Sequence, residues 1–203
     1  MFIVFVTGSL ASGKHAACTY LAKQGFTHID LDEMAKEFYE EDFVKWQIID
    51  AYGKSICDAS GQIVKAKLAE VAFAKEGASD ALNSIIWPLV NARLADIIVG
   101  SSSELNRLGE KLAVEIAMLA EAPEMAALAD SVLGIEADED IRIKRALARG
   151  MKLEDILNRI ALQASDATRA KLCDYVIENN GSLEEFEQKL ELWLQSQQEE
   201  HMF

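Results

Sequence analysis

The sequence has no hydrophobic run long enough to cross a bilayer, because stretches such as Phe2 to Val6 fall far short of the ~20 residues required. Phe2 to Thr7 also lacks the basic start of a secretory signal, so we expect a cytoplasmic protein with no membrane partner. Cysteine is scarce. Cys18, Cys57 and Cys173 are odd in number and widely spaced, which excludes a complete disulfide framework and a paired zinc motif. We expect all three to be buried by packing.

Basic residues are also few, with 20 Lys and Arg against 34 Asp and Glu and a net charge of −14. This balance excludes a surface that binds nucleic acids or acidic membranes through general electrostatic attraction. Residues 142–171 are the exception, since their eight basic and three acidic residues give +5 and leave −19 elsewhere. Such a local basic patch fits a small anionic ligand. We expect a monomer, with a small homo-oligomer as the alternative.

Apolar patterning predicts strands that alternate with helices, which favours a parallel sheet covered on both faces. Pro88 is expected to break or kink the helix that contains it. Ser182 and Glu185 form a capping box that opens the last helix. The expected strands are 2–7, 27–29, 111–116, 131–135 and 174–177, and the expected helices are 14–23, 33–52, 65–75, 79–98, 139–149, 153–164 and one after 182.

A phosphate-binding loop follows the first strand, because Gly8 to Lys14 matches the pattern G-x-x-x-x-G-K. Glycines let the backbone N–H groups wrap a phosphate, and the next helix adds its positive N-terminal end. Lys14 would bridge the terminal phosphates of a nucleotide. The expected nucleotide contacts are Gly8, Ser9, Leu10, Ala11, Ser12, Gly13, Lys14, His15 and Ala16.

The residue after Lys14 should carry the hydroxyl that ligates Mg²⁺, but this position is His15. Imidazole suits softer metals, whereas Mg²⁺ prefers oxygen ligands. The favoured interpretation is that His15 turns aside while water takes its ligand position, and the alternative is a change of metal.

Several downstream segments resemble the dephospho-CoA kinase family. Gly25 to Lys36 contains that family's glycine, short strand and Asp-x-Asp, and residues 177–182 resemble its Ile-x-Asn-Asn-Gly-Ser. Further matches are Gly61–Lys65, Leu68–Phe73, Leu82–Asn91, Val114–Glu121, Arg145 with Arg149, and Arg159-Ile160 with Gln163.

The resemblance covers residues 2–193 and implies a three-layer α/β/α P-loop kinase with a parallel sheet of about five strands. It implies a core of 2–32, 111–137 and 172–200, a helical acceptor-binding subdomain at 33–100 and a helical lid at 138–171. The implied reaction is phosphorylation of the 3′-hydroxyl of dephospho-CoA, with ATP and Mg²⁺.

The resemblance also implies residue roles. Lys14, Asp32 and Arg145 would be catalytic, with Asp32 as the base near the hydroxyl, and Arg145 and Arg149 would close the lid over the nucleotide. Glu115 would support Mg²⁺ through water. The acceptor would meet Asp32, Lys65, Trp87, Asn91, Glu115, Arg159 and Gln163. Helix capping is the structural alternative for Asp30 and Asp32.

Besides His15, four further positions depart from the family pattern: Trp87 replaces a histidine, Asn91 an arginine, Ala117 a proline and Ala120 an aromatic residue. Neutral Asn91 cannot offset the loss of an arginine that clamps an anion. Two alternatives to the kinase therefore stay open. One is a degenerate family member that binds a nucleotide or CoA-like ligand with little transfer, and the other is a kinase with a different acceptor stacked on Trp87.

Overall fold

The computed structural model describes residues 1–72, 74, 77–99, 111–120 and 122–201. The chain divides into two compact units, one of residues 1–30 with 102–203 and one of residues 31–101. The elements are β1 (Phe2–Gly8), α1 (Lys14–Lys23), β2 (Thr27–Asp30), α2 (Leu31–Phe38), α3 (Asp42–Tyr52), η1 (Lys54–Ile56), α4 (Lys65–Ala72), α5 (Asp80–Val99), β3 (Lys111–Glu115), η2 (Pro123–Leu128), β4 (Ser131–Glu136), α7 (Glu139–Ala148), α8 (Leu153–Leu162), α9 (Asp166–Ala170), β5 (Tyr175–Glu178) and α10 (Leu183–His201).

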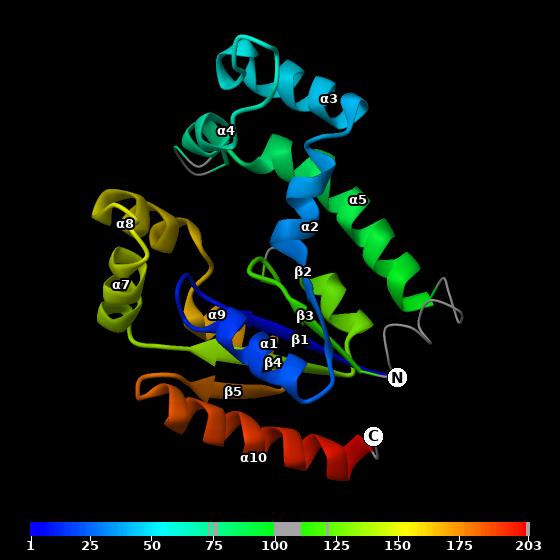
Figure 1. Ribbon diagram of the computed structural model, residues 1–203, viewed down its shortest axis with the longest axis vertical. Helices are drawn as coiled ribbons and strands as arrows, with labels where there is room; N and C mark the ends of the chain where they lie inside the picture. Colours follow the sequence, from blue (N-terminus) through cyan, green and yellow to red (C-terminus); the bar gives the residue numbers. More distant parts are fainter. Residues whose placement is uncertain (73, 75–76, 100–110, 121, 202–203) are drawn as a thin grey trace. The chain divides into compact units, whose positions relative to one another are not determined.

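The first unit is built on a five-stranded parallel sheet with strand order β2-β3-β1-β4-β5 (Figure 1). All seven residues of β1 are buried, as expected for a central strand covered on both faces. Val6 pairs with Glu115 of β3, and Glu115 pairs in turn with Asp30 of β2. Three neighbouring strands therefore end close together, at the edge from which the loop after β1 emerges.

Alternate residues of β1 supply the two faces of the sheet. Val4 and Val6 join a core cluster with α1 and α10, to which α10 contributes Phe186, Leu190 and Trp193. Burying each such side chain contributes about 1.5–3 kcal/mol. The short helix α9 packs against β1 and β4, so helices cover the sheet on both sides (Figure 1).

The second unit consists of the helices α2 to α5. Its longest helix, α5, buries Leu82, Ile86, Val90 and Leu94, which are four residues apart and so lie along one side of the helix. The helix continues through Pro88, so it does not break there, and the alternative expectation of a kink stays a prediction. Pro88 is exposed, and the buried residues before and after it keep both parts of the helix packed.

Other sequence predictions have mixed outcomes. The single helix expected at 33–52 is two helices, because residues 39–41 leave the helical conformation between α2 and α3. The capping box is confirmed: Ser182 N donates to Glu185 Oε2 at 2.9 Å, and Glu185 N donates to Ser182 Oγ at 3.2 Å.

Cys18 is fully buried, whereas Cys57 and Cys173 are only partly so. The end of the helix expected at 65–75, together with Phe73 and Glu121, lies outside the described residues.

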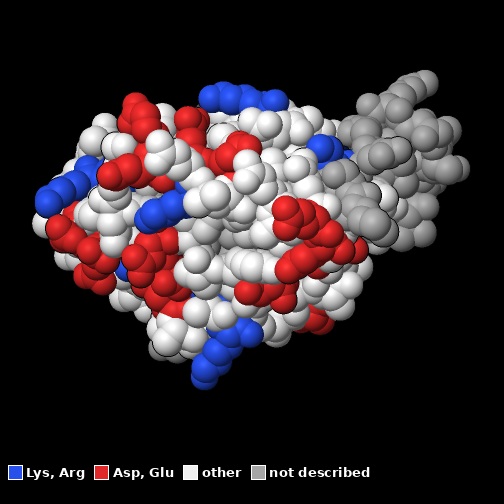
Figure 2. Space-filling model, turned by 90° about the horizontal axis from the view of Figure 1, so that it is seen from below, with Lys and Arg blue, Asp and Glu red and all other residues white. Residues whose placement is uncertain are grey.

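No helix among the described residues combines the length and the apolar character needed to span a membrane. Figure 2 shows the side of the molecule on which α10 lies, and its charged surface is mainly acidic. The α10 sequence accounts for much of this charge, because it contains six glutamates and one lysine. Such a surface repels polyanions.

Candidate functional site

The loop between β1 and α1 has the backbone geometry of a phosphate cradle. Gly13 has φ 117°, and a Cβ there would lie 2.2 Å from Asn179 Nδ2, so only glycine fits. Ala11 is held at φ 58°, which costs a non-glycine residue about 1–2 kcal/mol and is typical of functional loops. The hydroxyls of Ser9 and Ser12 are buried and have no hydrogen-bond partner among the described residues. Phosphate oxygens would accept hydrogen bonds from them, so the loop fits a polyphosphate.

Lys14 opens α1 and folds back over this loop. Its Nζ donates to the carbonyl oxygens of Gly8 at 3.0 Å and Ser9 at 3.2 Å. The ammonium group is therefore held against the cradle, where it can exchange carbonyl contacts for contacts with phosphate oxygens.

A cavity of about 200 Å³ adjoins the loop and contains both predicted lid arginines. Arg145 donates to the Ser12 carbonyl oxygen at 3.4 Å and to Asn179 Oδ1 at 3.3 Å. Burial and the charge of Arg149 lower the pKa of Arg145. The cavity is lined by Ala11, Gly13, Ala16, Arg145, Arg149, Asn179, Gly181, Leu183 and Phe186. Two guanidinium groups beside a phosphate loop suit a nucleotide.

Asn179 joins the segment after β5 to this loop. Its side-chain Nδ2 donates to the Ser12 carbonyl oxygen at 2.8 Å, while its Oδ1 accepts from Arg145. Asn179 belongs to a segment, residues 177–182, that matches the family, but the match implies no role for this residue. The motif was the signal in the sequence that could have pointed to Asn179. Its contact with Ser12 could be recognised only from the folded structure.

Gln163 and Arg159 were predicted to meet the acceptor. The structure places Gln163 just after α8, where its Oε1 accepts from the backbone N–H of Leu10 at 2.9 Å. Arg159 is exposed in the last turn of α8. Gln163 therefore supports the phosphate loop from the lid side, and its contact with an acceptor stays a prediction.

His15, His28 and Glu115 form a linked group beside Lys14. His15 Nδ1 and His28 Nε2 each lie 3.2 Å from Glu115 Oε2, so the expectation that His15 turns aside is not met. Burial disfavours ionisation of Glu115, but the hydrogen bond from His28 and the charges of Lys14 and both histidines outweigh it, and its pKa is lowered. Asp30 completes the group, whose possible ligand atoms all lie within 4.8 Å of one another.

This donor set does not match the magnesium ion that the family resemblance implies. Mg²⁺ prefers an octahedron of oxygen ligands, whereas two of the four donors here are imidazole nitrogens. Glu115 and Asp30 could accept hydrogen bonds from the water around Mg²⁺, but His15 offers no oxygen. We therefore assign no step of the reaction to protein-bound Mg²⁺.

Four of the seven predicted acceptor residues lie in the second unit, namely Asp32, Lys65, Trp87 and Asn91. Asp32 is exposed in the first turn of α2, and Lys65 is exposed at the start of α4. Trp87 and Asn91 are partly buried one turn apart on α5. Asn91 Oδ1 is buried with no hydrogen-bond partner in the part of the chain that the structure describes.

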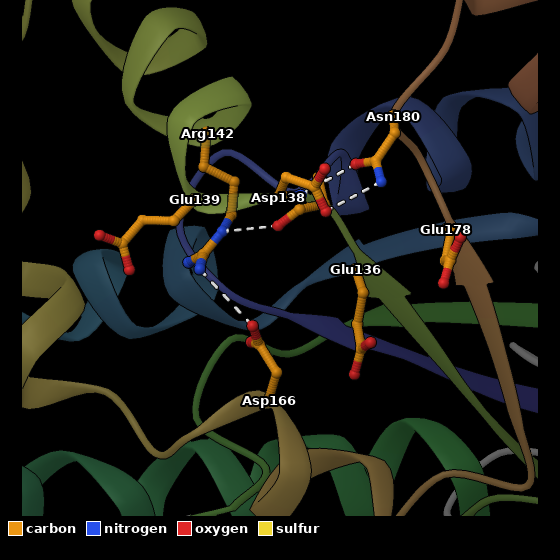
Figure 3. A pocket seen from close by; sticks show the side chains of 8 residues that line it. Glu136, Asp138, Glu139, Arg142, Asp166, Glu178 and Asn180 are labelled. Atoms are coloured by element: carbon orange, nitrogen blue, oxygen red, sulfur yellow. Dashed lines mark hydrogen bonds and ion pairs between the residues drawn. The ribbon is translucent and has the colours of Figure 1, made fainter.

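A second cavity, of about 320 Å³, lies at the ends of β4 and β5 (Figure 3). Arg142 is 5% exposed there, donates from Nε to the Ala137 carbonyl oxygen at 2.9 Å and lies 3.5 Å from Asp166. Arg142, Arg145 and Arg149 are spaced to share one face of a helix, but the contacts of Arg142 with Ala137 and Asp166 place its guanidinium beside this second cavity. The other charged lining residues, Glu136, Asp138, Glu139, Asp166 and Glu178, are acidic, which excludes a phosphate site.

The parallel sheet, the glycine-rich loop after its central strand and the lysine that follows define a P-loop kinase fold. The family model for dephospho-CoA kinase matches residues 2–185. The chain therefore belongs to the dephospho-CoA kinase family, whose members are phosphotransferases.

Two curated relatives match over most of their length. The chain is 34% identical over 185 residues to the dephospho-CoA kinase of Carboxydothermus hydrogenoformans, covering 90% of this chain and 87% of that protein. It is 32% identical over 195 residues to the dephospho-CoA kinase of Oceanobacillus iheyensis, covering 95% and 96%.

Solved structures share the fold. A Thermus thermophilus protein superposes with a TM-score of 0.77 at 26% identity, over 96% of this chain and 97% of that one. Dephospho-CoA kinase from Campylobacter jejuni gives 0.67 at 23% identity over 95% of each chain. Shikimate kinase from Acinetobacter baumannii gives 0.59 at 15% identity, over 97% and 94%, which shows the fold alone.

Proposed function

We propose that the protein transfers the γ-phosphate of ATP to the 3′-hydroxyl of dephospho-CoA. Support comes chiefly from the loop around Lys14, which combines a folded-back ammonium group with the buried hydroxyls of Ser9 and Ser12. The family model supports the acceptor. Small-molecule substrates and a cytoplasmic location accord with this reaction, and we expect a monomer.

The nucleotide half of the reaction is assigned to the first unit. The loop from Gly8 to Ala16 would hold the phosphates, and Lys14 would offset the charge that develops on the transferring group. Arg145 and Arg149 would close over the nucleotide from the lid. Closure excludes water, so that phosphate reaches the acceptor and is not lost to hydrolysis.

The acceptor half is assigned to Asp32, with Lys65, Trp87 and Asn91 as binding residues. The 3′-oxygen forms a bond to the γ-phosphorus, and the bond from that phosphorus to the β–γ bridging oxygen breaks. The hydroxyl proton passes to the Asp32 carboxylate. The products are ADP and coenzyme A, so atoms and charge balance.

The test is a coupled ADP-release assay with ATP, dephospho-CoA and either Mg²⁺ or Mn²⁺, with mass spectrometry to identify coenzyme A. Asp32→Asn should lower kcat by about 10²–10⁴-fold, the range for one general base. Glu33→Gln is the matched control, since Glu33 is exposed beside Asp32 and pairs with Lys36 at 2.6 Å. Well-folded protein that forms no coenzyme A with either ion would overturn the proposal.

A binding protein without efficient transfer was the main alternative, motivated by His15, Trp87 and Asn91. The family model and the near-complete coverage of curated kinases do not favour it. The same assay separates the two, because a binding protein would give ligand-induced thermal stabilisation without product.

A further inference from the structure

Four side chains at one edge of the sheet offer metal ligands from elements far apart in the sequence. Asp30 and Glu115 end β2 and β3 and are paired in register. His28 lies two residues before Asp30, on the same face of β2. His15 is the second residue of α1 and reaches the group from the phosphate loop.

The ligand atoms are spaced as one ion would require. Two atoms that each lie about 2.0–2.1 Å from a tetrahedral ion are about 3.3 Å apart. Both imidazole nitrogens lie 3.2 Å from Glu115 Oε2, and all four residues have a ligand atom within 4.8 Å of the others. Only small side-chain rotations would bring the four atoms around a shared centre.

Charge and burial favour a cation at this point. The Glu115 side chain is 13% exposed and that of His28 is 20% exposed, whereas His15 is 68% exposed. Two carboxylates match the charge of one divalent ion, and Asp30 and Glu115 are both partly buried, where such charge compensation is favourable. The exposed side, at His15, leaves room for water or a phosphate oxygen to complete the coordination.

We propose that His15, His28, Asp30 and Glu115 bind one divalent first-row transition ion, of the class of Mn²⁺, Co²⁺ or Zn²⁺, in preference to Mg²⁺. Mixed imidazole and carboxylate ligands suit these ions, and affinity rises along the series from Mn²⁺ to Co²⁺. The imidazole of His15 takes the place of the hydroxyl that ligates Mg²⁺ in related loops.

A role for this ion in phosphate transfer rests on the proposed function, because the site adjoins Lys14 and the phosphate cradle. Binding of the ion does not rest on it. The metal site and the proposed kinase function can therefore fail independently of each other. For this reason the experiment measures metal binding in the absence of nucleotide.

The test titrates the full-length, metal-free protein with Co²⁺ and follows visible absorption, with Zn²⁺ calorimetry as a second probe. We expect one ion per chain and no displacement by a large excess of Mg²⁺. His15→Ser and His28→Gln should each weaken binding by at least about a hundredfold, because the loss of a ligand should cost no less than the loss of a group that supports one, which costs about 10–100-fold.

His201→Gln is the matched control, because His201 lies in α10 against the Phe2 ring and outside the cluster. It should leave binding unchanged. Because His15 is exposed, we expect His15→Ser to fold normally. This variant therefore tests the metal site even if His28→Gln disturbs folding.

Equal affinity of the wild type and the His15→Ser variant for Co²⁺ and Zn²⁺ would overturn the metal site, as would the absence of stoichiometric binding or ready displacement by Mg²⁺. Coenzyme A formation with no such binding overturns only this inference. Stoichiometric binding with no coenzyme A formation overturns only the proposed function.

Discussion

The side-chain amide of Asn179 donates a hydrogen bond to the backbone carbonyl oxygen of Ser12 over 2.8 Å, within a buried environment. The same side chain accepts from Arg145. One residue after β5 therefore links the phosphate loop to the lid, and its amide can fill both roles because it has a donor and an acceptor.

Replacing Asn179 with alanine should remove both contacts and leave the buried Ser12 carbonyl oxygen without this donor. We expect the free energy of unfolding to fall by about 1–3 kcal/mol and the KM for ATP to rise. Urea denaturation and initial-rate kinetics measure the two effects. Asn180→Ala is the control, because Asn180 is exposed and its side chain bonds to Asp138, so the change should alter stability by less than about 0.5 kcal/mol. Equal effects of the two substitutions would contradict the role of Asn179.

Replacing Gly13 with alanine should disable the phosphate loop. The new Cβ would lie 2.2 Å from Asn179 Nδ2 at a backbone φ of 117°, so the loop must shift. We expect nucleotide binding to be lost, as measured by the thermal shift that ATP produces. Gly150→Ala is the control that separates backbone strain from a steric clash. Gly150 has φ 84°, so alanine is strained there, but its added Cβ would have no atom within 4 Å. It should lower stability by about 1–2 kcal/mol and leave the ATP-induced shift intact.

Arg145→Gln should raise the KM for ATP by about tenfold to a hundredfold, because a charged hydrogen bond contributes about 1.5–3 kcal/mol. Lys144→Gln is the matched control on the same helix, since Lys144 is exposed and pairs with Asp140 at 3.2 Å. Its KM should equal that of the wild type. An unchanged KM in the Arg145 variant would remove this arginine from the nucleotide site.

Stability should decrease as the pH rises from about 9 to 11. Burial, followed by the charge of Glu136, raises the pKa of Cys173 to about 11, above its value of ~8.5 in an unfolded chain. The folded state thus favours the neutral thiol, and this contribution is present below pH 8.5 and is lost as the pH rises through 11. Because Cys173 is only partly buried, we expect it to amount to about 1–2 kcal/mol.

Urea denaturation at pH 8 and pH 10.5 measures this loss in the wild type, in Cys173→Ala and in Cys57→Ala. The Cys173 variant should lose less stability between the two pH values than the wild type. Cys57→Ala should lose as much stability as the wild type. An equal loss of stability between the two pH values in all three proteins would refute the assignment of the pH dependence to Cys173.

The sequence predicted the parts of the site that depend on neighbouring residues. Gly8 to Lys14 predicted the loop from spacing alone, and Ser182 with Glu185 predicted the start of α10, because both patterns act within a few residues. Local spacing did not reveal the role of Arg142, whose buried guanidinium pairs with the partly exposed carboxylate of Asp166. Its partner lies on another helix, so periodicity within α7 could not reveal the contact.

The group at His15 could not be predicted because it depends on the order of the strands. His28 and Asp30 meet Glu115 only when β3 lies between β1 and β2. Nothing local to any of these residues encodes that order. The contact between Asn179 and Ser12 has the same origin, since it joins the segments after β5 and β1.

Val6, Glu115 and Asp30 are paired across three neighbouring strands. The ligand group at this edge of the sheet therefore forms only when β1, β2 and β3 have the correct register. A slip of one residue in β3 would turn Glu115 to the opposite face and separate it from both histidines. An ion that binds this group would bind only the correctly aligned sheet, and mass action would then add its binding free energy to that alignment.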